Sequence, residues 1–142
     1  MRITFLLALF LLGGCRETPT LANLYSTIDG ANVEVHVLSL EADVARKRLL
    51  VRGRLSISSN QPMRDISLDC LQLSLGNSLS TEVNVDKAGG ASTSNYPGKS
   101  RKHIELPMLW AIPGVHGEPR AEHLRIATEE NRRHCVIYER VD

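Results

Sequence analysis

The chain of 142 residues is 42% hydrophobic and 4% aromatic, and 17 Lys and Arg against 16 Asp and Glu give a formal net charge of +1. That length suits one domain with its own core. The near-neutral charge argues against nucleic acid as a partner, since a nucleic-acid binder is expected to carry a net basic face, and against attachment to a membrane through a polybasic patch.

The N-terminal segment has the features of a secretory signal. Arg2 places a positive charge behind the first residue, and residues 3–12 are apolar except for Thr4. Ten helical residues rise about 15 Å, roughly half the hydrocarbon thickness of a bilayer, so a stable transmembrane helix is not expected. A basic tip, a short apolar run and a small-residue end predict a signal peptide that is removed, and a buried core helix is the weaker alternative.

The end of this segment, Leu12-Gly13-Gly14-Cys15, resembles the lipobox of bacterial lipoproteins, in which an aliphatic residue and two small residues precede a cysteine. The resemblance implies cleavage between Gly14 and Cys15, a diacylglycerol on the Cys15 thiol, and an acyl chain such as palmitate on the new amino group. Two or three acyl chains anchor a protein stably. In this family an Asp after the lipidated cysteine favours the inner membrane. Arg16 stands there, so we expect an outer-membrane protein of the cell envelope that faces the periplasm.

The expected domain organisation has three parts. They are a signal peptide over residues 1–14, a lipidated N-terminus and tether over residues 15–30, and one β-sandwich domain over residues 31–142. The tether is polar, and residues 20–28 are compatible with a brief helical turn or an edge strand. Removing the signal peptide, which contains one arginine, leaves equal numbers of basic and acidic residues in the mature chain.

Two cysteines remain once Cys15 is assigned to lipid. Cys70 and Cys135 are an even pair in the oxidising compartment that the lipobox implies, so we expect a disulfide between them. In the chain-entropy model, a bridge closing a loop of about 65 residues stabilises the fold by roughly 4 kcal/mol. Two separate buried thiols are the alternative.

Alternating apolar residues predict seven short strands. The first covers residues 32–38, and the second covers residues 49–58, where Gly53 indicates a bulge or a close packing contact. Polar turn signals fill residues 59–65. The third strand, residues 66–75, changes phase after its cysteine, which predicts either a bulge or a strand covered on both faces.

The rest of the chain continues this pattern. Residues 78–85 are a short strand candidate. Residues 86–100 are rich in Gly and Ser and predict a long loop. Three further strands are expected over residues 101–110, 123–128 and 134–140, separated by polar loops.

Seven short strands without a long amphipathic helix predict an all-β fold, an antiparallel β-sandwich. The spacing G-x-L-x-x-S-x-N-x-P-x-x-x-I over residues 53–66 resembles the immunoglobulin-like accessory domains of bacterial envelope proteins. Cys70, Trp110 and Cys135 occur in the order of the Cys–Trp–Cys core of immunoglobulin domains, but Cys70 falls one strand later than in that fold. We therefore expect an immunoglobulin-like sandwich without assigning the immunoglobulin strand topology.

The sequence contains no recognisable catalytic motif. It lacks the GxSxG, SxxK and HExxH patterns and a glycine loop that would cradle a phosphate, so we expect no enzyme activity and no cofactor. His103, His116 and His123 are a conceivable metal site. Solvent-facing histidines near turns are favoured, because no second histidine or carboxylate lies at chelating spacing.

The functional expectation combines the lipobox, the β pattern and the lack of catalytic motifs. It is a lipid-anchored envelope protein that acts as a non-enzymatic protein-interaction or assembly module. The expected partners are the membrane, through the lipid on Cys15, and another envelope protein, with no nucleic acid. Trp110 is either a core residue or an anchor for that protein. The alternatives are an inhibitor or immunity protein against an envelope hydrolase and, less favoured, a metal-assisted hydrolase.

Overall fold

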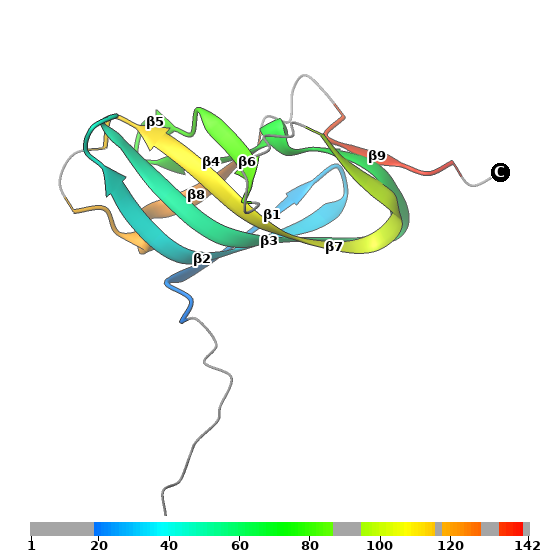
Figure 1. Ribbon diagram of the computed structural model, residues 1–142. Helices are drawn as coiled ribbons and strands as arrows, with labels where there is room; N and C mark the ends of the chain where they lie inside the picture. Colours follow the sequence, from blue (N-terminus) through cyan, green and yellow to red (C-terminus); the bar gives the residue numbers. More distant parts are fainter. Residues whose placement is uncertain (1–18, 87–94, 116–117, 129–133, 141–142) are drawn as a thin grey trace, which may run out of the picture.

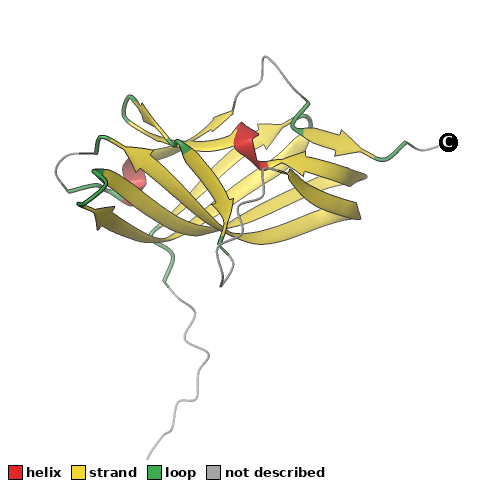
Figure 2. Cartoon of the chain, turned by 45° about the horizontal axis from the view of Figure 1, so that its top comes forward, coloured by secondary structure: helices red, strands yellow, loops and turns green. Residues whose placement is uncertain are grey.

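The computed structural model describes residues 19–86, 95–115, 118–128 and 134–140, and most of this chain is β-strand (Figure 2). Two short 3-10 helices, η1 (Leu68–Cys70) and η2 (Ala121–His123), lie among the strands. In chain order the strands are β1 (Ala22–Ile28), β2 (Ala31–Asp43), β3 (Arg48–Ser67), β4 (Leu71–Leu75), β5 (Ser78–Leu79), β6 (Glu82–Val85), β7 (Asn95–Pro113), β8 (Leu124–Thr128) and β9 (Val136–Tyr138).

The strands form two sheets that stack as two layers (Figure 1). The larger sheet has the order β1-β2-β3-β7-β6, with β9 also paired to β3, and the smaller sheet has the order β5-β4-β8. Every pairing is antiparallel. Both sheets contribute to one cluster of buried apolar residues. The all-β, antiparallel sandwich predicted from the sequence is confirmed.

The strand order follows an immunoglobulin-type sandwich over most of the domain. Strands β2-β3-β7-β6 take the order A-B-E-D, and β5-β4-β8 take the order C′-C-F. Two strands depart from that plan, because β1 is added outside β2 and β9 pairs with β3 instead of β8. The disulfide differs for the same reason. It joins η1 to the start of β9, whereas the antibody disulfide joins strands B and F.

The long strands of the larger sheet alternate between buried and solvent-facing residues, as the period of two along a strand requires. Their outer face is mostly polar. The inward-facing buried residues of β2, β3 and β7 include Ala31, Val33, Val35, Val37, Leu49, Val51, Leu55, Ile57, Met63, Ile66, Ile104, Leu106, Met108, Trp110 and Ile112.

Trp110 is fully buried in this core. Its Nε1–H donates a hydrogen bond to the carbonyl oxygen of Leu71 at 2.8 Å. Because Trp110 lies on β7 and Leu71 on β4, this bond joins the two sheets. The interpretation of Trp110 as an anchor for a partner protein is wrong, since none of its surface is accessible, and the core interpretation is correct.

The boundary at residue 31 is also wrong, because part of the expected tether belongs to the sheet. β1 pairs with β2 along its whole length, from Ala22 opposite Val37 to Ile28 opposite Ala31. Asp29 and Gly30 connect the two strands with φ values of 49° and 81°. Positive φ at both residues is the requirement of a type I′ hairpin turn, for which Asp-Gly is a preferred pair. The domain therefore begins with β1.

The predicted turn over residues 59–65 lies within β3, which runs on to Ser67. Its polar residues coincide with irregular pairing, since the register with β7 shifts between Ser58 and Met63. Beyond the shift, β3 is hydrogen-bonded to both β7 and β9. Pairing with distant strands thus overrides the local turn signals.

Two further predictions differ from the structure at points where the chain passes from one sheet to the other. The phase change near Cys70 is the 3-10 helix η1, after which the chain continues as β4 in the smaller sheet. The predicted strand over residues 78–85 is two strands, because β5 pairs with β4 and β6 pairs with β7 in the other sheet. Of the predicted loop over residues 86–100, residues 87–94 lie outside the described residues and residues 95–100 belong to β7.

Gly53 lies where β2 and β3 approach closely. The register of the two strands shifts between Val37 and Ser39, beside the residue opposite Gly53. A Cβ on Gly53 would lie 2.6 Å from the carbonyl oxygen of His36 and 3.4 Å from the ring of Trp110. The sequence predicted a bulge or a close contact at this glycine, and the structure contains both.

Gly53→Ala is expected to lower the free energy of unfolding by about 1–3 kcal/mol, because the backbone of β2 must move away from the new methyl group. Urea unfolding followed by Trp110 fluorescence measures this change. Ser58→Ala, on the outer face of the same strand, is the control and should alter stability by less than about 0.5 kcal/mol. An unchanged stability in Gly53→Ala would contradict the close approach.

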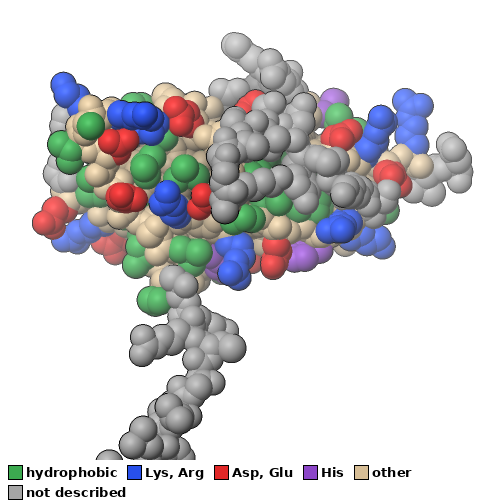
Figure 3. Space-filling model, in the orientation of Figure 1, with side chains coloured by type: hydrophobic (Ala, Val, Ile, Leu, Met, Phe, Trp, Pro, Cys, Tyr) green, Lys and Arg blue, Asp and Glu red, His purple; other side chains and the backbone are tan. Residues whose placement is uncertain are grey.

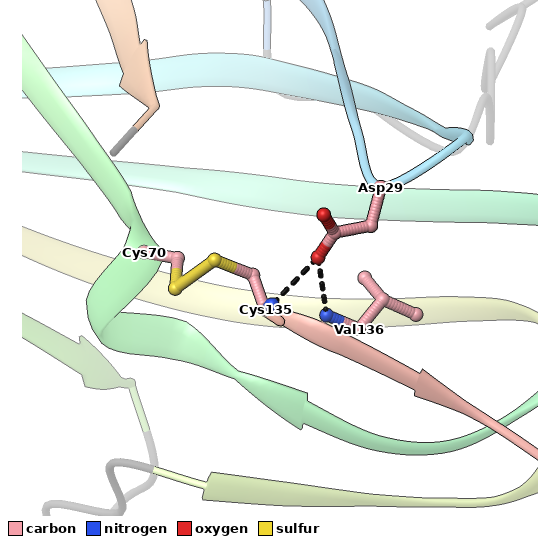
Figure 4. The surroundings of a disulfide bond; sticks show 4 residues. All are labelled: Asp29, Cys70, Cys135 and Val136. Carbon is pink, nitrogen blue, oxygen red and sulfur yellow. Dashed lines mark hydrogen bonds between the residues drawn. A yellow bond between two sulfur atoms is a disulfide. The ribbon is translucent and has the colours of Figure 1, made fainter. Parts of the chain in front are cut away.

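The C-terminal strand β9 is fastened at its start (Figure 4). Asp29 Oδ2 accepts hydrogen bonds from the backbone N–H groups of Cys135 at 2.6 Å and Val136 at 3.0 Å. The Tyr138 hydroxyl donates a hydrogen bond to the carbonyl oxygen of Asp29 at 2.6 Å. Cys135 is also bonded to Cys70, which confirms the predicted disulfide. The β1–β2 turn and η1 therefore both hold β9.

Asp29→Gly is expected to lower the free energy of unfolding by about 1–3 kcal/mol, since two backbone N–H groups lose a charged acceptor. Glycine adopts the positive φ of this position without strain, so the variant removes the carboxylate and adds no backbone clash. Asp29→Asn should lose less, because its amide oxygen still accepts and Asn tolerates this conformation. Urea unfolding of both variants with the disulfide intact tests whether Asp29→Gly loses more stability than Asp29→Asn. Wild-type stability in Asp29→Gly would contradict the role of the carboxylate.

Candidate functional site

Strand β1 forms an edge of the larger sheet; among the described residues it pairs with β2 alone, and it lies close to β8 of the smaller sheet without pairing with it. Its seven residues, ANLYSTI, include no charged residue and no proline. The opposite edge, β6, has four residues and carries Glu82. Natural sheet edges usually carry charges, prolines or bulges that block pairing with another chain. The lack of these features makes β1 the candidate interaction site.

The β1–β2 hairpin determines which backbone groups of β1 are free to pair. In a two-residue turn the carbonyl of Ile28 accepts from the N–H of Ala31, so these residues form a hydrogen-bonded pair. Bonded and non-bonded pairs alternate along an antiparallel ladder. The N–H and C=O groups of Asn23, Tyr25 and Thr27 therefore point away from β2, where they line the open edge of the sheet.

Tyr25 stands out on this strand because 71% of its surface is exposed. Its register neighbour is Glu34 on β2, followed across the sheet by Ser56 on β3 and Glu105 on β7. Beside this row lies an open depression of about 500 Å³ in which Glu34 is the one charged lining residue. The depression is lined by Tyr25, Ser26, Thr27, Asn32, Val33, Glu34, Ser56 and Ser58.

Two arginines on β3 are held by carboxylates of β2 and of β6 and the residue that follows it, and β6 lies beyond β7 from β3. Arg48 Nε lies 3.0 Å from Asp43 Oδ2, and Arg48 Nη1 lies 3.2 Å from Glu82 Oε2. Arg52 Nε lies 3.5 Å from Asp86 Oδ2. The hydrogen bond from Arg48 holds the pKa of the Asp43 carboxyl below its ordinary value. These residues form an internal charge network on the side of the sheet away from β1.

A second depression, of about 540 Å³, lies between the β4–β5 turn and the segment that leads into β8. Arg120 and Arg125 line it, but both are engaged locally. Arg125 Nη1 donates hydrogen bonds to the carbonyl oxygens of Glu122 and Leu124, and Arg120 Nη1 lies 3.4 Å from Glu122 Oε1. Basic and acidic side chains are likewise interspersed over the face shown in Figure 3. This depression is therefore the weaker candidate.

The lipobox residues Leu12, Gly13, Gly14 and Cys15 lie outside the described residues, as does His116. His103 Nε2 lies 3.3 Å from Glu105 Oε1 on the outer face, whereas His123 belongs to η2. In the described ranges no three potential metal ligands cluster together. In the same ranges no helix is long and apolar enough to cross a membrane.

Sequence reasoning placed residues 15–30 in the tether and gave an edge strand over residues 20–28 as one of two alternatives; the structure confirms the edge strand, but the sequence did not mark it as an interaction site. The available signal was Asp29-Gly30, because this dipeptide between two extended runs predicts a tight hairpin. The strand before it is difficult to recognise, since its inward positions include Ala22 and Ser26 as well as Leu24. Only pairing with β2 makes the segment a strand.

Comparisons with known proteins do not assign this site. Family models, curated proteins and solved structures were all searched, and none of them matches the chain.

Proposed function

We propose that this protein is a lipid-anchored cell-envelope module, without enzymatic activity, that binds another protein by adding an extended segment of that protein to β1. The observation that carries the proposal is the uncharged, proline-free open edge of β1. In strand addition, backbone hydrogen bonds supply much of the affinity, and side chains at alternate positions supply specificity. β1 offers both, through its outward backbone groups and the exposed ring of Tyr25.

The lipid anchor in this proposal rests on the motif Leu12-Gly13-Gly14-Cys15. Six residues lie between Cys15 and Ala22, the first residue of β1, so seven Cα-to-Cα steps join them. At full extension they span at most about 25 Å, roughly half the reach of a tether that continues to residue 30. A lipid on Cys15 therefore keeps the β1 edge close to the membrane surface.

The anchor is tested by Cys15→Ser expressed in a bacterium that processes lipoproteins. The wild type is expected to incorporate labelled palmitate and to fractionate with the membrane. Cys15→Ser should incorporate none, because it lacks the thiol that accepts the lipid. The double variant Cys70→Ala, Cys135→Ala is the control and should keep its label. Equal labelling of Cys15→Ser and wild type would contradict the proposed lipidation.

Strand addition is tested by a photo-crosslinking amino acid at Thr27 in intact cells, combined with substitutions at Tyr25. Tyr25→Pro removes an outward N–H and should reduce the crosslinked adduct at least tenfold relative to Tyr25→Ala, which loses the same ring but keeps the N–H. Proline is tolerated at an open edge, so thermal unfolding should verify that both variants fold. Equal adduct yields in the two variants would argue against backbone pairing at β1.

A further inference from the structure

We propose that the strand added to β1 places an arginine or lysine opposite Tyr25, where its charge reaches Glu34 on β2. This inference rests on the proposed function, because it specifies which extended segment the β1 edge accepts. It follows from three features of the outer face. Tyr25 and Glu34 lie in one row across the sheet, Glu34 has no lysine or arginine partner among the described residues, and two arginines of this domain reach carboxylates across an intervening strand.

The domain itself contains the geometry that this contact requires. Arg48 on β3 reaches Glu82 on β6 with an Nη1–Oε2 distance of 3.2 Å, although β7 lies between the two strands. Arg52 on β3 reaches Asp86, just after β6, in the same direction with an Nε–Oδ2 distance of 3.5 Å. A cation on a strand outside β1 has the same relation to Glu34, with β1 as the strand that it crosses.

Glu34 lacks a permanent positive partner. Its Oε1 lies 3.1 Å from Nε2 of His36, which is charged only when protonated. Among the described residues no lysine or arginine nitrogen lies within 4.0 Å of this carboxylate. This includes Arg54, which lies opposite His36 on β3. The Glu34 side chain is 36% exposed, which leaves it accessible to a cation from solvent.

The second contact of His36 determines whether the ring nitrogen that faces Glu34 carries a proton. His36 Nδ1 lies 2.6 Å from Asn23 Oδ1. An amide oxygen only accepts, so the ring proton belongs on Nδ1. Nε2 lies 3.1 Å from Glu34 Oε1, so it donates to Glu34 only when the ring carries a second proton. An incoming guanidinium or ammonium group supplies a donor that does not depend on that second proton.

Tyr25 provides the path for the incoming side chain. Tyr25 is 71% exposed and lies in the same row as Glu34, between that residue and the edge of the sheet. A cation over a tyrosine ring gains an additional electrostatic attraction. Beyond the ring, the small side chains of Ser56 and Ser58 leave the depression that receives the charged end. An acidic side chain at the same position would be repelled by Glu34.

The test uses the full-length lipoprotein with a photo-crosslinking amino acid at Thr27, compared in intact cells with and without Glu34→Gln. We expect Glu34→Gln to lower the adduct yield about fivefold, the effect of one favourable ion pair at a surface. Glu105→Gln is the matched control, because Glu105 also has a histidine partner, His103, but is two strands farther from the edge. It should leave the yield unchanged.

The outcomes separate this inference from the proposed function. An adduct that Tyr25→Pro removes and Glu34→Gln leaves unchanged overturns the basic residue and retains strand addition. No adduct in the wild-type background overturns both. Sequencing of the crosslinked peptide should place Lys or Arg opposite Tyr25. Replacing that residue with Glu should then abolish the adduct, and Glu34→Lys should restore it.

Discussion

The two-residue turn at Asp29-Gly30 is the constraint on which the candidate site depends. Its positive φ values fix Ile28 opposite Ala31, and this register places Leu24 in the core and Tyr25 in solvent. A shift of one residue would exchange the two faces of β1, because side chains alternate along a strand. The Asp29 carboxylate also holds the start of β9. One turn therefore positions both the edge strand and the C-terminal strand.

The placement of β9 explains why the edges of this sandwich differ from those of an immunoglobulin domain. β2 pairs with β3 as far as Ser58, and β9 pairs with the continuation of β3 from Met63 to Ile66. β9 thus extends the centre of the larger sheet and does not lie beside β8. The Cys70–Cys135 disulfide keeps it there, since it ties the start of β9 to η1. Among the described strands, β1 and β8 consequently remain terminal in their sheets.

Local pattern was sufficient for the sequence to predict the sandwich and the close contact at Gly53, and the even cysteine count together with the compartment that the lipobox implies predicted the disulfide. It failed where distant partners decide the conformation. Residues 59–65 carry turn signals, yet β7 and β9 hold them in an extended strand. β1 has a weak alternation that becomes a strand only against β2. The candidate site was missed for the same reason, because Tyr25 and Glu34 are neighbours only through the hairpin register, which Asp29-Gly30 indicates and the weak alternation of β1 obscures.

Backbone pairing at an open edge is largely independent of sequence, so an edge without charged residues or proline, such as β1, would accept many extended segments. Selection must then come from side chains beside the edge, and the row of Tyr25 and Glu34 supplies an aromatic surface followed by a negative charge. On the proposed lipid anchor, a tether of at most about 25 Å adds a second restriction. It favours a partner that presents its strand at the same membrane, because confinement there raises the effective concentration. Charge beside the edge and proximity to the bilayer together make a weak contact selective.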